Sequence, residues 1–249
     1  FHRAGFTVLA FDYRRLGESG GRPRLVQRVR AQLADWRAAV AFAAALPGVQ
    51  PGRVAVWGFS LSGGHVLRVG ALDGVGAVIA QTPNADGQAA TRNALRHQSI
   101  GALLHTFGVA LLDAVGGLVG RRPLLIPLDG PRGSVAVLTT PDAVGGGAVL
   151  DPDNRYPQWQ QKIAARSILG MGTYRPGRAA SKVRCPLLVV VADDDRSALA
   201  EPSVRAAERA PKADLVRVPG GHYAPFLDQH DAVVGAELEF LDRVLAGGR

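Results

Sequence analysis

The sequence predicts an α/β fold with a doubly wound, mostly parallel sheet and an inserted, largely helical cap. Short apolar runs rich in strand formers alternate with segments of helical periodicity, a pattern typical of parallel sheets covered by helices on both faces. The alternation stops at about residue 88 and resumes after 181. We therefore expect residues 1–87 and 182–249 to form one core in two parts, separated by a cap at 88–181.

The first part of the core contains three strands and two helices in this interpretation. Three apolar runs are expected to be buried strands, namely 6–11, 53–57 and 75–80. Two segments with helical spacing or composition follow the first two runs, namely 29–43 and 61–73. The residues after Phe1 resemble the end of a helix that runs directly into a strand, so we expect the first strands of the sheet to be missing.

Periodicity also predicts the elements of the cap and of the second part of the core. Helical spacing in the cap predicts two helical stretches, at 95–112 and 159–169. After the cap, two strands are expected at 187–192 and 215–218, and two helices at 202–210 and 233–245. Each of the two strands ends in a loop with ionisable residues, which places those residues at the carboxyl edge of a parallel sheet.

Composition restricts the classes of function. The chain has 29 basic residues and a net charge of +8, but the basic residues are mostly scattered single arginines without interleaved aromatics, so no nucleic-acid partner is expected. No uninterrupted apolar run reaches the length of about 18 residues that crosses a bilayer, so no membrane partner is expected either. The single cysteine, Cys185, cannot form an internal disulfide, which favours a reducing, cytoplasmic location. Neither a metal nor another cofactor is indicated, and the oligomeric state is left open.

A candidate nucleophile lies in the stretch Trp57-Gly58-Phe59-Ser60-Leu61-Ser62-Gly63-Gly64. Small residues here coincide with the point where a predicted strand turns into a predicted helix, which is the setting of a nucleophile elbow. Ser60 is favoured as the nucleophile because Ser62 is two positions further from the strand and already inside the helix. The usual motif ends in glycine where this chain has Ser62, another small residue.

A serine nucleophile needs a histidine base and an acid that orients it. Three aspartates follow the strand at 187–192, and Asp195 is preferred over Asp193 and Asp194 because the loop has by then turned toward the histidine. His222 follows the last predicted strand and is flanked by glycines that permit a tight loop. His65 is expected to pack within its helix. The remaining histidines have surface or packing roles as their default, namely His2, His97, His105 and His230.

These residues resemble the α/β-hydrolase superfamily, in particular its dienelactone-hydrolase-like and prolyl dipeptidyl-peptidase-like group. The similar segments span nearly the whole chain: Phe11-Asp12-Tyr13-Arg14 with Gly17-Glu18-Ser19, the elbow Gly58–Gly64, Gln81-Thr82-Pro83 with Asp86-Gly87, the strand before Asp195, and Gly221-His222-Tyr223. The resemblance implies a sheet of about eight strands, of which the last five are present. It also implies a triad of Ser60, Asp195 and His222.

An oxyanion hole requires backbone amide donors. One is expected to be the N–H of Leu61, while the other normally comes from a loop that would precede Phe1. This sequence lacks that loop, so either the chain is a fragment of the active protein or its oxyanion hole is incomplete. Three residues could line a substrate pocket, namely Phe107, Trp159 and Tyr223.

Three functions are compatible with the sequence. The favoured one is a serine hydrolase that cleaves a small-molecule ester or thioester through an acyl-serine intermediate. The second is acyl transfer by the same triad, in which a capped crevice excludes water. The third is a non-catalytic binding or scaffold protein that has kept the fold.

Overall fold

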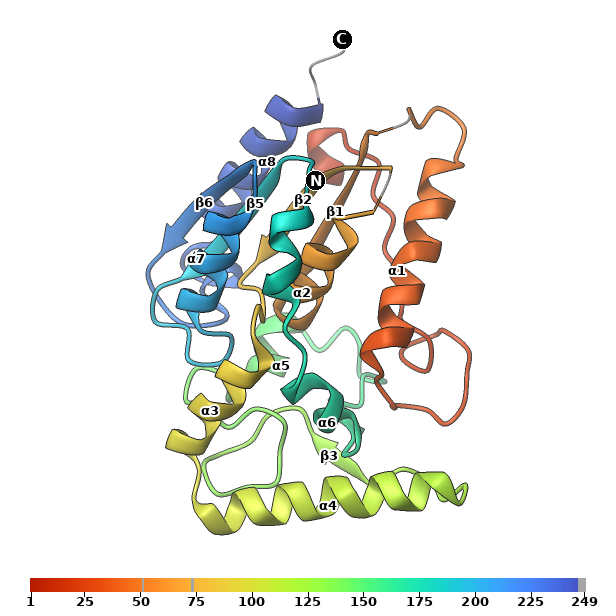
Figure 1. The fold of residues 1–249 in the computed structure, drawn as a ribbon, viewed down its shortest axis with the longest axis vertical. Coiled ribbons are helices and arrows are strands. Elements are labelled where there is room, and N and C mark those ends of the chain that lie inside the picture. The colour runs from red at the N-terminus through yellow and green to blue at the C-terminus, as the bar shows by residue number, and fades with distance from the viewer. Residues whose placement is uncertain (51, 73, 246–249) are drawn as a thin grey trace. The chain divides into compact units, whose positions relative to one another are not determined.

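The computed structural model describes residues 1–50, 52–72 and 74–245, which form two compact units (Figure 1). Unit 1 consists of Phe1–Phe11, Leu33–Asp86 and Arg175–Arg249, and unit 2 consists of Asp12–Gln32 and Gly87–Tyr174. The predicted cap at 88–181 shares most of its residues with unit 2. Its bounds stay a prediction, because compactness alone does not define a cap.

Unit 1 contains a sheet of four parallel strands in the order β1-β2-β5-β6. The strands are β1 (Val54–Phe59), β2 (Val75–Gln81), β5 (Leu187–Ala192) and β6 (Ala213–Val218). β5 is buried along its whole length, as expected for a continuous apolar strand with neighbours on both sides. Because the strands are parallel, the loops that follow them all emerge at one edge of the sheet.

Helices cover both faces of this sheet, which confirms the predicted doubly wound fold (Figure 1). Helices α2 (Ser60–Val69) and α7 (Ala200–Arg209) pack on one face, and α8 (His230–Leu245) packs on the other. Alternate residues of the strands point to opposite faces. Thus Ile79 and Leu188 join the core under α8, together with Val233 and Phe240 of that helix.

Three short 3-10 helices and one longer helix complete the elements that lie wholly or partly in unit 1. The 3-10 helices are η1 (His2–Ala4), η2 (Pro176–Lys182) and η3 (Ala224–Phe226). Helix α1 (Val29–Ala44) begins in unit 2 and continues into unit 1, where Trp36 makes an edge-to-face ring contact with Phe11 at 5.0 Å between centroids. The helix was predicted over almost the same residues.

The regular elements of unit 2 are mostly helices, together with a two-stranded antiparallel sheet. Its helices are α3 (Gly87–His97), α4 (Ile100–Leu118), α5 (Gly146–Leu150) and α6 (Ser167–Gly172), and its strands are β3 (Leu125–Pro127) and β4 (Lys162–Ala164). A small apolar core gathers residues from α4, β3 and β4 and one residue just after β4, namely Ala110, Ile126, Ile163 and Ala165.

A buried ion pair holds α4 against the rest of unit 2. Asp113 accepts hydrogen bonds from the backbone N–H of Leu124 at 2.7 Å and from the guanidinium of Arg166 through two nitrogens, both at 2.8 Å. Burial acts to raise the pKa of Asp113, but the hydrogen bonds and charge of Arg166 together hold it below its usual value. The carboxylate is therefore paired on both oxygens, the condition under which a buried charge is tolerated.

Two predicted elements are wrong, and a third, the helical stretch predicted at 95–112, is divided between α3 and α4. Residues 6–11 form no strand, and Val8 and Leu9 are exposed, because no segment of the described ranges pairs with them in a ladder. The second helical stretch of the cap, predicted at 159–169, divides into β4 and the start of α6, and Trp159 lies outside both. The helix predicted at 61–73 ends at Val69, and its predicted last residue, Asp73, lies outside the described residues.

A buried carboxyl group lies beneath α8. Glu237 is 2% exposed, and one of its oxygens accepts a hydrogen bond from the indole N–H of Trp57 at 3.0 Å. Burial raises the pKa of Glu237 to about 7, although the Trp57 hydrogen bond and nearby positive charge, including that of His230, act in the opposite direction. The group therefore takes up a proton well above the pH at which an exposed glutamate does.

We expect this carboxyl to make stability depend on pH. Between about pH 4.5 and 7 the folded protein binds more protons than the unfolded chain, so the free energy of unfolding falls as pH rises, by about 3 kcal/mol in total. Urea unfolding across this range should show the fall in the parent protein and lose most of it in Glu237→Gln. The matched control is Glu239→Gln, an exposed residue of the same helix; equal pH profiles for the two variants would contradict the assignment.

Candidate active site

Ser60 stands at a sharp strand-to-helix turn. It follows Phe59, the last residue of β1, and begins α2 with a φ of +54°. A non-glycine residue in this region is strained, and such strain persists only where the surrounding structure enforces it. Its carbonyl accepts a hydrogen bond from the backbone N–H of Asn84 at 2.9 Å, so the loop after β2 holds the turn in place.

Three glycines allow the backbone to approach closely around this turn. A Cβ on Gly58 would lie 2.5 Å from the carbonyl oxygen of Ser62, and one on Gly64 would lie 2.7 Å from that of Asn84. On Gly63 it would lie 2.9 Å from the Cα of Pro83. These contacts are with backbone, which cannot swing aside as a side chain can. The small residues of the elbow are therefore required by packing as well as by the turn itself.

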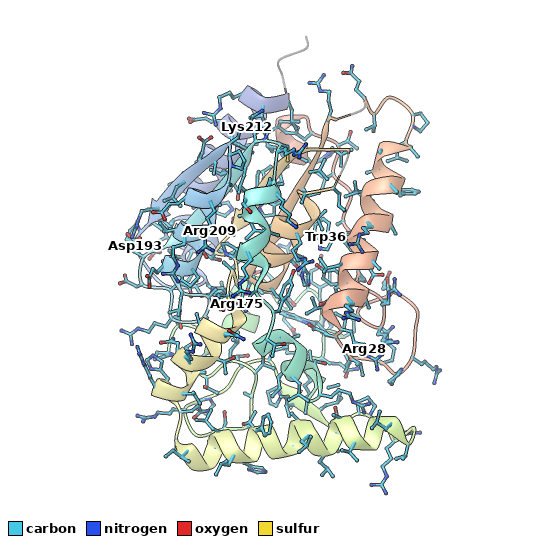
Figure 2. The ribbon with its side chains drawn as sticks, viewed as in Figure 1. Arg28, Trp36, Arg175, Asp193, Arg209 and Lys212 are labelled. Carbon is cyan, nitrogen blue, oxygen red and sulfur yellow. The ribbon has the colours of Figure 1, made fainter. Side chains whose placement is uncertain are left out.

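Asp195 is held in the loop after β5 by the backbone. One carboxyl oxygen accepts hydrogen bonds from the N–H groups of Ser197 at 2.8 Å and Ala198 at 2.7 Å. The other oxygen lies 2.7 Å from Nδ1 of His222. The two alternatives have other partners: Asp193, which is labelled in Figure 2, pairs with Arg217 of β6, and Asp194 faces the N–H of Gly220.

His222 connects this carboxyl group with the serine. It follows β6 after Gly220, whose φ of +100° permits the tight turn that the flanking glycines predicted. Nε2 lies 2.9 Å from Oγ of Ser60, and the ring is 1% exposed. The three side chains Ser60, His222 and Asp195 thus form one continuous chain of hydrogen bonds at the carboxyl edge of the sheet.

Two aromatic rings contact the imidazole, and a third packs behind one of them. Phe59 lies 4.8 Å from the His222 ring at a tilt of 34°, and Tyr223 meets it edge-on at 5.1 Å. Phe226 packs edge-on against Phe59 at 4.8 Å. Sequence reasoning named Tyr223 but missed the two phenylalanines. The adjacency of Phe59 to the nucleophile was the available signal, although an aromatic beside a strand end is equally typical of ordinary core.

The remaining candidates have different surroundings. Leu61 is in the first turn of α2, where backbone N–H groups have no acceptor within the helix. His65 is fully buried in α2, and burial, with the charge of Arg68, lowers its pKa to about 4, so it remains neutral. Phe107 and Trp159 belong to unit 2, and their role as pocket walls stays a prediction.

The arrangement matches the requirements of nucleophilic catalysis. With Nδ1–H donated to Asp195, the other imidazole nitrogen can accept the proton of the Ser60 hydroxyl. The hydrogen bond between His222 and Asp195 is buried, whereas the one between His222 and Ser60 is only partly buried. Within the described ranges, no group of three or more His, Cys, Asp or Glu side chains is placed to hold a metal ion.

The fold and this constellation define an α/β hydrolase, and the chain belongs to the alpha/beta hydrolase family, whose model matches residues 1–236. It is 35% identical over 248 residues to the quorum-quenching protein AidA of Acinetobacter baumannii, covering 98% of this chain and 79% of AidA. Over 136 residues it is 32% identical to the polyketide transferase af380 of Aspergillus fumigatus, covering 53% of this chain and 43% of that protein.

A solved structure shows the same fold. The alpha/beta hydrolase GrgF of Penicillium sp. sh18 superimposes with a TM-score of 0.71 at 23% identity, covering 94% of this chain and 78% of GrgF. The resemblance noted in the sequence is thereby confirmed at the level of the family and the fold.

Alanine substitutions at two helical glycines, one at the elbow and one in α8, should have opposite effects on stability. Gly64→Ala should lower the free energy of unfolding by about 1–3 kcal/mol, because the new methyl group meets backbone of the 82–84 loop. Gly235→Ala in α8 meets nothing within 4 Å and should raise stability, by up to about 1 kcal/mol, through helix propensity. Urea denaturation of both variants measures this; destabilisation of equal size would contradict the packing argument.

Proposed function

We propose that this protein is a serine hydrolase that cleaves a small-molecule ester or thioester through an acyl-Ser60 intermediate. The observation that carries the proposal is the hydrogen-bonded chain from Asp195 through His222 to Ser60, at 2.7 and 2.9 Å. Membership of the alpha/beta hydrolase family supports hydrolysis as the reaction class. The strained φ of Ser60 supports its role as the nucleophile, since strain of this kind gathers at functional sites.

In the first half of the reaction, Oγ of Ser60 attacks the acyl carbon while Nε2 of His222 takes the hydroxyl proton. Asp195 fixes the tautomer of the imidazole and stabilises the imidazolium that forms. The N–H of Leu61 donates to the oxyanion of the tetrahedral intermediate. His222 then gives its proton to the departing alcohol or thiol, and the acyl group remains on Ser60.

In the second half, His222 takes a proton from a water molecule, whose oxygen attacks the acyl-enzyme carbonyl. Collapse of this second intermediate returns the proton to Ser60 and releases the carboxylic acid. The rings of Phe59 and Tyr223 contact the imidazole on two sides. They keep it aligned through both halves of the reaction.

A fluorophosphonate probe tests the nucleophile. Such a probe should phosphonylate Ser60 in the parent protein, and intact-mass analysis with peptide mapping should locate the label there. Ser60→Ala should abolish labelling and lower ester hydrolysis by about 10⁴-fold or more. Ser62→Ala is the matched control, a serine two residues along the same helix, and should retain the label.

Three outcomes would contradict the proposal. Labelling that follows Ser62 would overturn the choice of nucleophile. A folded protein that neither takes the label nor hydrolyses any substrate would favour the binding or scaffold alternative. Activity that survives Ser60→Ala would exclude the acyl-serine route. Suitable substrates are p-nitrophenyl esters of graded chain length, the matching thioesters, and bacterial quorum-sensing signals, the last because AidA is named for quorum quenching.

Acyl transfer is the second candidate, favoured by the similarity to a polyketide transferase over 136 residues. In this case an alcohol or amine replaces water in the second half of the reaction. Product analysis with and without an added acceptor separates the two functions. Hydrolysis predicts the free acid in both mixtures, whereas transfer predicts that the acyl-acceptor product dominates when the acceptor is present.

A further inference from the structure

Helix α4 carries a stripe of large apolar side chains that face solvent. Six of them recur at intervals of three or four residues, which places them on one face of the helix. Their exposed fractions run from 50% to 87%, and the residues are Ile100, Leu104, Phe107, Leu111, Val115 and Leu118. Leu112 and Val119 extend the stripe at its margin, at 60% and 72%.

This outward stripe is the reverse of the usual arrangement in a surface helix, whose apolar face is turned to the core. The residues of α4 that are buried are Ala102, Ala110 and Asp113, which lie roughly on the opposite face. The ion pair of Asp113 with Arg166 fixes that orientation. In Figure 1 the other elements of unit 2 lie on one side of α4. The helix therefore cannot turn its apolar face inward without breaking a buried ion pair.

Among the described residues, α4 is the one helix long and apolar enough to cross a bilayer, with a mean hydropathy of 1.5 over 18 residues. Core helices of soluble proteins pass the same test, but they are mostly buried, whereas 22% of this window is buried. Helix α4 also carries the paired Asp113 on its inner side, which favours a helix that lies along a membrane surface over one that spans it.

The exposed arginines that flank α4 in the sequence lie at both of its ends. Arg92 and Arg96 precede α4, Arg121 and Arg122 follow it, and all four are exposed. Between residues 87 and 128 the sequence has one acidic residue, the buried Asp113. An apolar helical face bounded by arginines at both ends matches the surface of an anionic bilayer, in which acyl chains lie beneath phosphate groups.

A second copy of the chain fits this surface less well. Two α4 helices packed side by side would place arginines next to arginines in either direction, parallel or antiparallel. No exposed acidic side chain of the 87–128 segment could offset that repulsion. Like charges brought together across an interface cost free energy, whereas lipid phosphates would pair with the same guanidinium groups.

We propose that α4 docks this protein on anionic lipid bilayers, with its apolar stripe among the acyl chains and the flanking arginines at the phosphate groups. Such binding is consistent with the lack of a long uninterrupted apolar run in the sequence, because an interfacial helix needs one apolar face and not an apolar circumference. The proposal does not depend on the chemistry of Ser60.

Vesicle flotation with the full chain tests the proposal. The protein should float with vesicles of phosphatidylcholine containing about 30 mol% phosphatidylglycerol and much less with phosphatidylcholine alone. Leu104→Gln/Leu111→Gln should weaken the binding by about tenfold or more, since two exposed leucines no longer enter the bilayer. Arg121→Gln/Arg122→Gln should weaken it by about tenfold on anionic vesicles and leave the weak neutral binding unchanged.

The matched control is Phe42→Gln/Leu227→Gln, which removes two exposed apolar side chains of unit 1 at 58% and 53% exposure. It should bind like the parent protein. Because all substituted residues are exposed, circular dichroism should show unchanged folding for each variant.

Several results would overturn the proposal. These are no flotation of the parent protein, equal flotation of the parent and the Leu104/Leu111 variant, or equal binding to neutral and anionic vesicles. A dimer in sedimentation velocity that dissociates in the Leu104/Leu111 variant would assign the stripe to a second copy instead.

Discussion

The close approach of backbone segments around Ser60 is the constraint on which the organisation of unit 1 depends. β1 must end, reverse direction and begin α2 within two residues, while the loop after β2 crosses near enough for Asn84 to donate to the Ser60 carbonyl. No Cβ fits at Gly58 or Gly64 without displacing backbone. This packing holds the serine in a strained conformation at the edge where the loops after β5 and β6 also arrive.

The buried ionisable groups of unit 1 show how differently one fold treats similar side chains. His65 and His222 are both almost completely buried, yet His65 is enclosed in the helix layer, whereas His222 lies between Asp195 and Ser60. Glu237 is as buried as Asp195 but has an indole N–H as its partner instead of two backbone amides and an imidazole. The partner of each group, more than its depth, separates a structural role from a chemical one.

In unit 2, too, the partner of a buried ionisable group decides the outcome. The paired carboxylate of Asp113 determines which side of α4 faces inward, and the apolar residues on the other side remain exposed as a consequence. Hydrophobicity alone would favour the opposite orientation. A helix held in this way keeps its apolar face exposed, whereas ordinary packing would have buried that face in the core. This exposed face is the physical basis for the proposed docking.

The sequence by itself determined the alternation of strands and helices, the position of the elbow, and the candidate residues at strand ends, because periodicity and turn chemistry are local properties. Residues 187–192 were predicted as a strand with the bounds that β5 has. The strand predicted at 6–11 failed, since a ladder requires a partner that local sequence does not reveal. The sequence favoured Asp195 over its two neighbours. The tertiary structure established its 2.7 Å contact with His222 and placed Phe59 against that ring. It also decided which face of α4 meets solvent, because that choice depends on Arg166, a residue far away in the chain.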